Sequence, residues 1–274
     1  VLFTDEAYSG LTHDYFASVL DSFKETAEKN DYDITFVNRN RERRRKMTYL
    51  EHVRYRGFDG VVIACVDFED PEVAQLVASD IPVVTIDHIF NNRIAVMSDN
   101  VKGMQSLLRY IYSCGHRRIA YIHGHPSSVT GSRLSSFYKT AEELGLKVPD
   151  EYVLEAGYRD TDGAAAATQQ LLALPCPPTC ILYPDDFACL GGMNMLREKG
   201  LRIPEDISIA GYDGLRIGRH MDPKLTTLKQ DTQKLGGYAA EKLISLIEHP
   251  KTSVPEILVV EGEVYEGRSV GNIG

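Results

Sequence analysis

Polar and aromatic side chains follow the ends of several short apolar segments that we predict to be strands. Ligands of open α/β sheets bind beyond the carboxyl ends of the strands, so these positions are candidates for a binding site. The residues are Tyr8, Tyr15, Phe16, Asp87, Arg133, Tyr158, Asp160, Asp185, Asp186 and Asp213. Carboxylates and an arginine hydrogen-bond well to sugar hydroxyls, which both donate and accept, and an aromatic face covers the C–H side of the ring. The set therefore predicts a site for a small polar molecule, such as a sugar, that needs no reactive group.

The same residues also have structural explanations that the sequence leaves open. Asp185 or Asp186 could cap the helix that follows, and Asp213 could be a turn residue. Arg133 could lie on the surface of a helix, and the aromatic pair at 15–16 could belong to the core.

Motifs for catalysis and for cofactors are missing from the sequence. The first strand is not followed by G-x-G-x-x-G, and neither G-x-x-x-x-G-K-[ST] nor H-E-x-x-H occurs. His123 and His125 have no third metal ligand, and Cys176 and Cys180 have no second pair. A glycosidase needs two carboxyls at a set separation, and nothing selects such a pair. We therefore predict that the protein is not an enzyme and uses no cofactor or metal.

Composition narrows the class of protein further. The chain has 274 residues and a net charge of −9, with a single basic run at 41–46 that reads as a solvated helix start. A domain that grips DNA phosphates by itself is usually basic. The chain has no apolar run of about 18 residues and no visible signal peptide, so no membrane association is predicted. Five cysteines, an odd number, are typical of free thiols in a reducing cytoplasm.

Short apolar strands alternate with amphipathic helices along almost the whole chain. The predicted strands lie at 1–4, 34–37, 60–64, 82–86, 94–97, 119–123, 152–155, 179–183 and 207–212, and the predicted helices at 13–29, 42–56, 71–79, 100–114, 131–144, 162–174, 187–199 and 232–248. This alternation predicts parallel sheets, and the apolar strands predict helices on both faces. Asp162 and Asp186 are predicted helix caps. The pattern occurs twice, with a break at 98–100, which indicates two doubly wound α/β lobes.

Several segments carry the resemblance to a known family. They are residues 98–100 (SDN) with Gly103, 115–120 (GHRRIA), 133–137 (RLSSF), 203–213 (IPEDISIAGYD) and 223–231 (PKLTTLKQD). In this order they resemble the signatures of LacI/GalR transcription regulators. The matches span the chain and are specific as a set.

The resemblance implies a fold like that of periplasmic sugar-binding proteins, with three crossovers between lobes. The first lobe would comprise 1–98 and 232–251, and the second would comprise 99–231 and 252–274. A helix-turn-helix domain that binds operator DNA would precede this chain, and the regulator would be a homodimeric repressor in the cytoplasm. The effector, a small polar molecule such as a sugar, would bind in the cleft between the lobes.

The resemblance also implies which residues contact the effector. Tyr15, Phe16 and Asp87 would do so from the first lobe; Arg133, Asp185 and Asp213 would do so from the second, and Gln230 from the second crossover. Tyr158, which follows a predicted strand, completes the predicted set. Two positions depart from the family, since Asp185 stands in place of an asparagine and Ser136 in place of a glycine. The extra carboxylate favours a neutral or cationic effector. An exported solute-binding protein of a sugar transporter is the alternative with the same fold.

Overall fold

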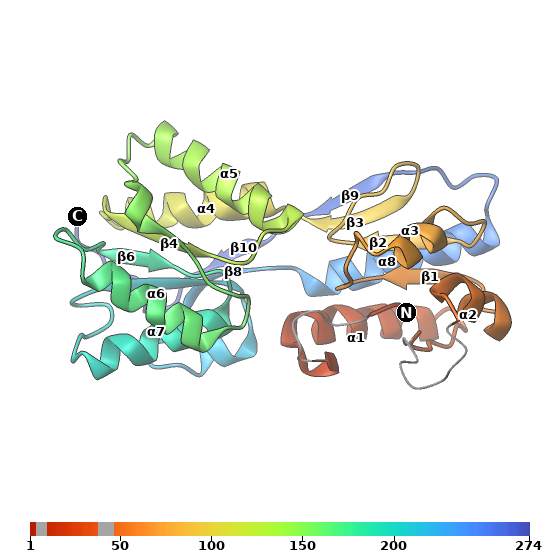
Figure 1. The fold of residues 1–274 in the computed structure, drawn as a ribbon, viewed down its shortest axis with the longest axis horizontal. Helices are drawn as coiled ribbons and strands as arrows, with labels where there is room; N and C mark the ends of the chain where they lie inside the picture. The colour runs from red at the N-terminus through yellow and green to blue at the C-terminus, as the bar shows by residue number, and fades with distance from the viewer. Residues whose placement is uncertain (4–9, 38–46) are drawn as a thin grey trace. The chain divides into compact units, whose positions relative to one another are not determined.

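The chain folds into two compact units, each built around its own sheet. A computed structural model describes residues 1–3, 10–37 and 47–274, and its ribbon is drawn in Figure 1. Unit 1 comprises Val1–Ser98 with Asp231–Val260, and unit 2 comprises Asp99–Gln230 with Glu261–Gly274. The backbone therefore passes from one unit to the other three times. Two mostly parallel sheets with flanking helices confirm the predicted fold class.

The last unit boundary differs from the sequence-based expectation. Residues 252–260 were expected in the second lobe, but they belong to unit 1, as does Asp231. The reason is the strand β9 (Ile257–Val260), which pairs in parallel with β3 (Ile94–Ser98). The backbone hydrogen bonds between β9 and β3 make this segment part of the first sheet.

Unit 1 has a four-stranded parallel sheet in the order β1-β2-β3-β9. Its other elements are the 3-10 turn η1 (Gly10–Thr12), α1 (Asp14–Glu28), α2 (Tyr49–Arg56), β1 (Val61–Ile63), α3 (Pro71–Val77), β2 (Val83–Ile86) and α8 (Thr232–Glu248). The helices α1 and α8 pack against each other, and α8 also lies against β1, β2 and β3 (Figure 1). The helices α2 and α3 bury a separate apolar cluster against the sheet, so both faces carry helices.

Two predicted strands in unit 1 are reduced to isolated bridges. Leu2 pairs with both Val37 and Ile63, so the segments at 1–3 and 34–37 continue the sheet by single bridges only. Tyr8 and the basic run at 41–46 lie outside the described residues.

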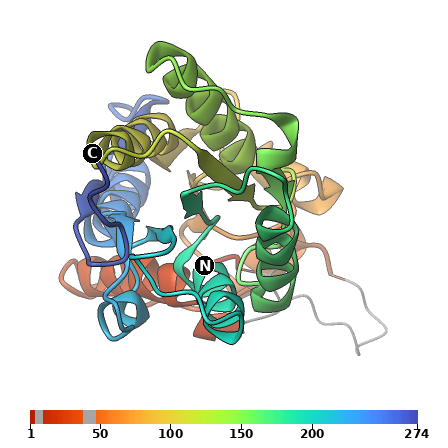
Figure 2. The ribbon, with the colours of Figure 1, turned by 90° about the vertical axis from the view of Figure 1, so that its left-hand side faces the viewer.

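Unit 2 has a six-stranded sheet in the order β10-β8-β7-β6-β4-β5, parallel except for β10. Its strands are β4 (Ile119–His123), β5 (Val153–Glu155), β6 (Cys180–Leu182), β7 (Ser208–Asp213), β8 (Thr226–Lys229) and β10 (Glu263–Tyr265). Its helices are α4 (Asn100–Ser113), α5 (Ser128–Glu143), α6 (Thr161–Leu172) and α7 (Asp186–Glu198), with 3-10 turns η2 (Asp150–Tyr152) and η3 (Arg216–Arg219). The pair α4 and α5 covers one face and the pair α6 and α7 covers the other (Figures 1 and 2).

Carboxylate caps begin α6 and α7 at positions that differ slightly from those predicted. Asp160, rather than Asp162, accepts a hydrogen bond from the backbone of Gly163 at the start of α6. Asp185, rather than Asp186, does the same for Ala188 at the start of α7. Each cap satisfies a backbone N–H that has no partner within the helix.

The C-terminal segment 267–274 is tied into unit 2 by buried hydrogen bonds. The Ser269 hydroxyl donates to the carbonyl of Ile209 and accepts from the backbone N–H of Thr226. His116, from the GHRRIA motif, is 1% exposed and lies between Thr179 and the carbonyl of Gly271. Because a carbonyl only accepts, His116 Nε2–H donates to the carbonyl of Gly271, and Nδ1 lies 2.9 Å from the Thr179 hydroxyl oxygen, which itself donates to the carbonyl of Arg118. The motif therefore anchors the end of the chain.

Candidate functional site

In unit 1, three of the polar groups at the carboxyl ends of the strands form one network. The Tyr15 hydroxyl donates to Asp87 Oδ2 at 2.8 Å, and the backbone N–H of Ser98 donates to Asp87 Oδ1 at 2.9 Å. The Tyr15 and Ser98 hydroxyl oxygens are 3.2 Å apart. Because the Tyr15 proton is given to Asp87, Ser98 is the donor in this third contact. The network joins the first turn of α1 to the ends of β2 and β3.

Asp87 has a φ of 57°, which lies in the left-handed region that non-glycine residues seldom adopt. The hydrogen bonds from Tyr15 and Ser98 hold it there. Phe16 packs edge-on against Tyr15, with ring centroids 5.0 Å apart, and it also contacts Phe3. Tyr15, Phe16 and Asp87, all predicted from the sequence, therefore lie together at one edge of the sheet.

A second aromatic group follows Asp87 directly. The His88 ring stacks on Phe68 with centroids 4.0 Å apart and an interplanar angle of 4°, and Phe90 packs against it. Burial lowers the pKa of His88, opposed by the charge of Glu69. The neutral form of the His88 ring is therefore favoured, so the charge of this neighbour of Asp87 changes little with pH above neutrality.

In unit 2, Arg133 is buried and held from several directions. Its side chain is 5% exposed. Nε donates to Asn100 Oδ1 at 2.8 Å, Nη1 donates to the carbonyl of Pro184 at 3.0 Å, and the guanidinium lies 3.6 Å above the Tyr212 ring. The hydrogen bonds and the cation–π contact fix the plane of the guanidinium. The alternative of a surface arginine is therefore wrong for Arg133.

Asp213 and Gln230 complete this group. Asp213 Oδ1 lies 3.9 Å from Arg133 Nη2, and it accepts a hydrogen bond of 2.6 Å from Gln230 Nε2. The backbone N–H of Gln230 also donates to the Asp213 carbonyl at 3.2 Å. Like Asp87, Asp213 has a positive φ, here 101°. The structure thus brings together Arg133, Asp213 and Gln230, three of the predicted residues.

Tyr158 and Asp185, the remaining predicted residues, take part in neighbouring contacts of unit 2. The Thr130 hydroxyl donates to the carbonyl of His125, so Tyr158 donates to Thr130 at 2.8 Å. The Tyr158 ring lies against Gly124, where a Cβ would come within 2.2 Å of it. Asp185 is 2% exposed and accepts from the backbone N–H groups of Arg159 and Ala188. Asp185 therefore caps α7, which is one of the structural explanations that the sequence leaves open.

Asp186 is fully buried and links three segments behind this group. It accepts from the Thr227 hydroxyl on β8 and from the backbone N–H of Leu215, each at 2.6 Å. Burial raises the pKa of the Asp186 carboxyl, the bond from Thr227 opposes this, and the charges of Asp213 and Asp185 raise the pKa further. Burial also raises the pKa of Asp185, against its backbone hydrogen bonds. Asp186 thus connects the start of α7 with β8 and with the segment that follows β7.

Sequence reasoning missed several residues that position the predicted ones. Asn100 and Tyr212 hold Arg133, and Ser98 holds Asp87. The sequence did contain a signal for these residues, since Ser98 and Asn100 belong to the SDN segment and Tyr212 immediately precedes Asp213. Ser136, the departure from the family glycine, is buried and donates to the carbonyl of Val101 on α4, so its hydroxyl is satisfied.

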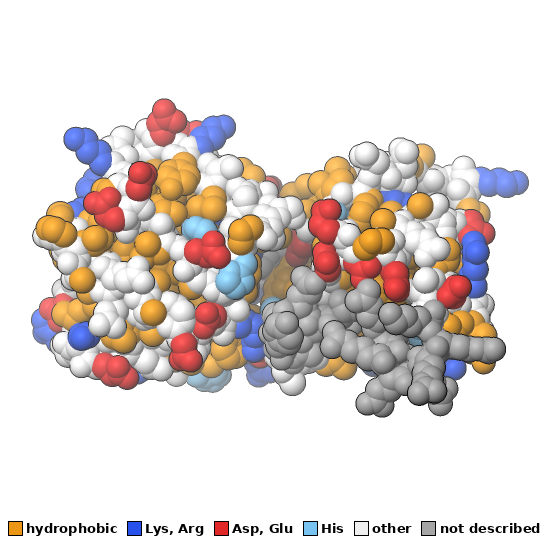
Figure 3. All heavy atoms as spheres, in the orientation of Figure 1, with side chains coloured by type: hydrophobic (Ala, Val, Ile, Leu, Met, Phe, Trp, Pro, Cys, Tyr) orange, Lys and Arg blue, Asp and Glu red, His pale blue; other side chains and the backbone are white. Residues whose placement is uncertain are grey.

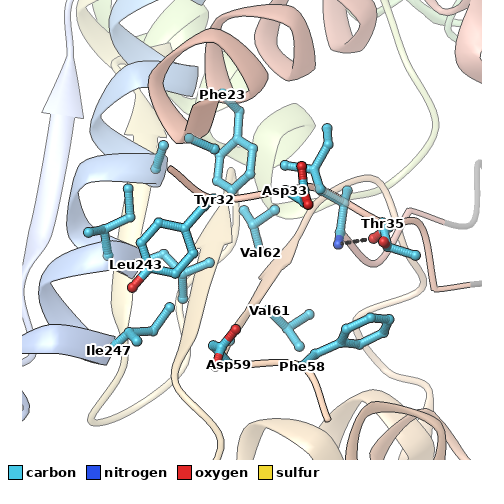
Figure 4. Close-up of a pocket in the computed structure, with 16 residues that line it drawn as sticks. Phe23, Tyr32, Asp33, Thr35, Phe58, Asp59, Val61, Val62, Leu243 and Ile247 are labelled. Atoms are coloured by element: carbon cyan, nitrogen blue, oxygen red, sulfur yellow. Dashed lines mark hydrogen bonds between the residues drawn. The ribbon is translucent and has the colours of Figure 1, made fainter. Parts of the chain in front are cut away.

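A separate cavity of about 90 Å³ lies at the opposite, amino end of the unit 1 strands (Figure 4). It is lined by side chains of α1, β1 and α8, including Phe23, Val61 and Leu243, and the amino group of Val1 donates to the carbonyl of Thr35 beside it. Pockets for small molecules usually enclose roughly 300–1,000 Å³. This cavity is therefore too small to compete as the main binding site.

The described residues form neither a metal site nor a membrane-spanning helix. Over residues 1–3, 10–37 and 47–274, no group of His, Cys, Asp and Glu is arranged to hold a metal ion. In the same ranges, no helix has the length and apolar character needed to cross a membrane. On the face drawn in Figure 3, the described Lys and Arg side chains are scattered.

Comparisons with known proteins agree with this geometry. Residues 108–270 match the family model of the periplasmic binding protein-like domain. The HTH-type transcriptional repressor PurR of Escherichia coli is 30% identical over 265 residues, which cover 94% of this chain and 76% of that protein.

Solved structures show the same fold. A LacI-type transcriptional regulator from Bacillus cereus subsp. cytotoxis superposes with a TM-score of 0.86 at 22% identity, over 100% of this chain and 98% of that one. A LacI family transcriptional regulator from Enterococcus faecium, solved with bound ribose, gives 0.84 at 23% identity, over 100% and 98% of the two chains.

The fold and the grouped polar residues at the strand ends thus define a periplasmic binding protein-like sensor domain. The chain belongs to the LacI/GalR family of transcriptional regulators, in which it is the effector-sensing part of a repressor.

Proposed function

We propose that this domain binds a neutral sugar as its effector and thereby controls operator binding by the regulator. The observation that carries the proposal is Arg133, a buried guanidinium fixed by Asn100 and Pro184 and facing Asp213. Burying a charge is costly unless its partners repay the cost. A fixed arginine beside a carboxylate offers a donor and an acceptor at once, which suits a hydroxyl group.

The proposed contacts come from both units. Tyr15, Phe16 and Asp87 act from unit 1, and Arg133, Asp213 and Gln230 act from unit 2. Tyr158 and Asp185 are proposed at the edge of the same site. The fixed conformations of Asp87 and Asp213 support this assignment, because strained backbone is retained where it serves binding. A single effector held by both groups remains a prediction, which variants in each unit test separately.

The nature of the solved neighbours supports a sugar. One neighbour is a CelR–cellobiose complex and another contains bound ribose. Neither group of polar residues places a nucleophile beside a general base, which supports a binding protein rather than an enzyme. The transporter alternative is not favoured, because the relatives are transcription regulators.

We further propose that the regulator is a cytoplasmic homodimer. It would contact operator DNA through a helix-turn-helix region, the element that the name of the E. coli relative mentions. A twofold dimer presents two such regions to half-sites about one helical turn apart. Effector binding would then change operator affinity by a coupling of about 1–3 kcal/mol.

The test has two parts. Titration calorimetry measures binding of D-ribose, D-glucose and cellobiose to the domain, and we expect at least one to bind with a Kd below about 1 mM. A gel shift with the intact regulator then measures operator affinity with and without that sugar at saturation. If no sugar binds, the proposed effector class is wrong. If a sugar binds and operator affinity is unchanged, the regulatory role is wrong.

A further inference from the structure

The strand β9 forms an edge of the unit 1 sheet, and its apolar side chains are exposed there. Among the described strands β9 pairs with β3 alone, and Figure 1 shows it as the outermost strand of its sheet. Ile257 and Val259 are 51% and 55% exposed, and Val254, just before the strand, is 64% exposed. Single exposed apolar side chains are ordinary on a protein surface, but here three share one short segment. The proposed effector site does not account for this segment.

The register of the sheet shows which face these side chains occupy. Ile257 is in register with Ala95 of β3. Ala95 is in turn in register with β2 and, through it, with Ile63 of β1. Neighbours in register point to the same face, and Ile63 belongs to the apolar cluster that α2 and α3 cover. Among the described residues, that cluster includes members of β1 and β2 but none of β3 or β9. Ile257 and Val259 thus lie on this face beyond the cover of α2 and α3.

The backbone of β9 faces outwards at the same two residues. The N–H of Ala95 donates to the carbonyl of Glu256, so residues 256, 258 and 260 direct their backbone groups toward β3. The intervening residues direct theirs to the other side, which places the N–H and C=O groups of Ile257 and Val259 on the open edge. At these two residues, β9 therefore presents both backbone hydrogen-bonding groups and apolar side chains.

The edge strands of unit 2 differ from β9 in charge. The outer strands β5 and β10 contain Glu155 and Glu263. Charged side chains in an edge strand discourage pairing with another chain, and proline has the same effect. Residues 257–260 are Ile, Leu, Val and Val, so β9 has neither protection.

The charges at both ends of β9 are compensated. Glu256 Oε1 lies 2.6 Å from Lys242 Nζ, and Glu261 Oε1 lies 2.6 Å from Lys102 Nζ. Like charges directly opposite each other destabilise a strand pair, but here each carboxylate already has its own cation. Two copies of β9 can therefore meet without net repulsion, which favours a second copy of this chain over a strongly charged partner.

We propose that β9 is a self-association edge, at which two copies of the protein pair their β9 strands in antiparallel orientation. A twofold axis at Leu258 places Ile257 opposite the partner's Val259, so each copy supplies the N–H and C=O groups that the other needs. The two four-stranded sheets then form one continuous sheet. A ladder of this length buries little area, so the association is weak, with a Kd of about 10–100 µM. The contact uses none of the residues of the proposed effector site and does not depend on the proposed function.

Sedimentation velocity of the domain, from about 1 µM to about 500 µM, measures this association. We expect the mass of the wild type to double across the range. Val259→Lys puts a charge into the edge strand, so its mass should stay at the low-concentration value. Val101→Lys is the matched control, because Val101 on α4 is 54% exposed, and it should associate like the wild type. Circular dichroism checks that each variant is folded.

A further variant tests the backbone pairing itself. Val259→Pro keeps an apolar side chain and the hydrogen bonds to β3, but it removes an N–H that points to the open edge. We expect it to associate about tenfold more weakly than the wild type, because the symmetric ladder loses a donor from each copy. Amide hydrogen exchange gives a second readout. The amides of Ile257 and Val259 should exchange several-fold more slowly at the high concentration, whereas that of Leu258, which faces β3, should not change.

Three results would each overturn the inference. A wild type of constant mass would show that β9 is not a self-association edge and would leave a strand of another protein as its occupant. Equal masses of the wild type and Val259→Lys at every concentration would place the association elsewhere on the molecule. A Val259→Pro variant that associates like the wild type would show a contact without strand pairing. None of these results bears on sugar binding, which tests the proposed function separately.

Discussion

The two units place a carboxylate in the same local setting but surround it differently. Asp87 follows β2 in unit 1 and Asp213 ends β7 in unit 2, and both have a positive φ. Each accepts a hydrogen bond from the last residue before a unit boundary, Ser98 in one case and Gln230 in the other. In both units, therefore, a group proposed to bind the effector is bonded directly to a point where the chain leaves the unit.

The two carboxylates differ in the charge of the groups that surround them. Asp87 is supported by the hydroxyl of Tyr15 and a backbone N–H, whereas Asp213 faces the buried guanidinium of Arg133. An ionised donor makes stronger hydrogen bonds to a hydroxyl than a neutral donor does, and of the two groups described only that of unit 2 contains such a donor. We therefore expect unit 2 to supply the larger share of effector affinity and unit 1 the smaller share.

The strongest test of this comparison is Arg133→Ala. The substitution leaves Asp213 without its cation and removes the donors offered to the effector, so we expect sugar affinity to fall by about 2–4 kcal/mol. Calorimetry with the best-binding sugar measures the loss. Arg109→Ala, which removes an exposed arginine paired with Glu143, is the control and should bind normally. An Arg133→Ala domain that is folded and binds with wild-type affinity would exclude the unit 2 site.

A smaller effect is expected from Asp87→Asn in unit 1. Asparagine tolerates the positive φ and keeps the size of the side chain, but it lacks the negative charge and one of the acceptor oxygens. We expect sugar affinity to fall by about 1–2 kcal/mol. Asp80→Asn, at an exposed residue paired with Arg54, serves as the control. A loss larger than that of Arg133→Ala would reverse the proposed order of the two units.

Tyr158→Phe should have a still smaller effect. The variant loses the hydrogen bond to Thr130 but keeps the ring against Gly124, so the aromatic surface stays in place. We expect sugar affinity to change by less than about 1 kcal/mol. Gly124→Ala pushes on the same ring and should weaken binding more than Tyr158→Phe does. Equal, unchanged affinities in both variants would remove Tyr158 from the site.

The smallest effect concerns pH and stability. Burial lowers the pKa of His116 below its ordinary 6.5, opposed by the bond to Gly271 and assisted by Arg117. The unfolded chain therefore binds a proton at a higher pH than the folded protein, so stability is full above about pH 6.5 and falls as pH decreases below it. Unfolding by urea between pH 8 and pH 5 should show this loss.

His116→Gln should flatten that dependence, whereas His249→Gln, at an exposed position, should not. His88 in unit 1 shares the direction of the shift, so His88→Gln should remove a further part of the slope. A slope that survives both substitutions would assign the pH dependence to other groups.

The fold class and most helices could be predicted from the sequence because local signals were strong. The helix expected at 232–248 has the observed bounds, and apolar runs marked β4 and β6. The strands β8, β9 and β10 were missed as strands, because pairing with distant partners, not local pattern, makes them part of a sheet. The same limit explains why residues 252–260 were assigned to the wrong unit.

The candidate site could be predicted in part for a similar reason. Position after a strand, together with family resemblance, indicated Asp87, Arg133 and Asp213. It could not show which of Asp185 and Asp186 caps α7, since both have the right chemistry and only backbone geometry decides between them. Nor could it show that Asn100 and Pro184 fix Arg133, because these contacts join segments far apart in the chain.

The three passages between units also constrain how a nascent chain can fold. Unit 1 needs α8 and β9, which are synthesised only after residues 99–230, and unit 2 needs β10 and the segment at 267–274. On the ribosome, β3 therefore remains an uncovered sheet edge, and unit 1 lacks the helix that packs on α1, until almost the whole chain has been made. Exposed edges and apolar faces favour aggregation, so the nascent chain is vulnerable until late in its synthesis.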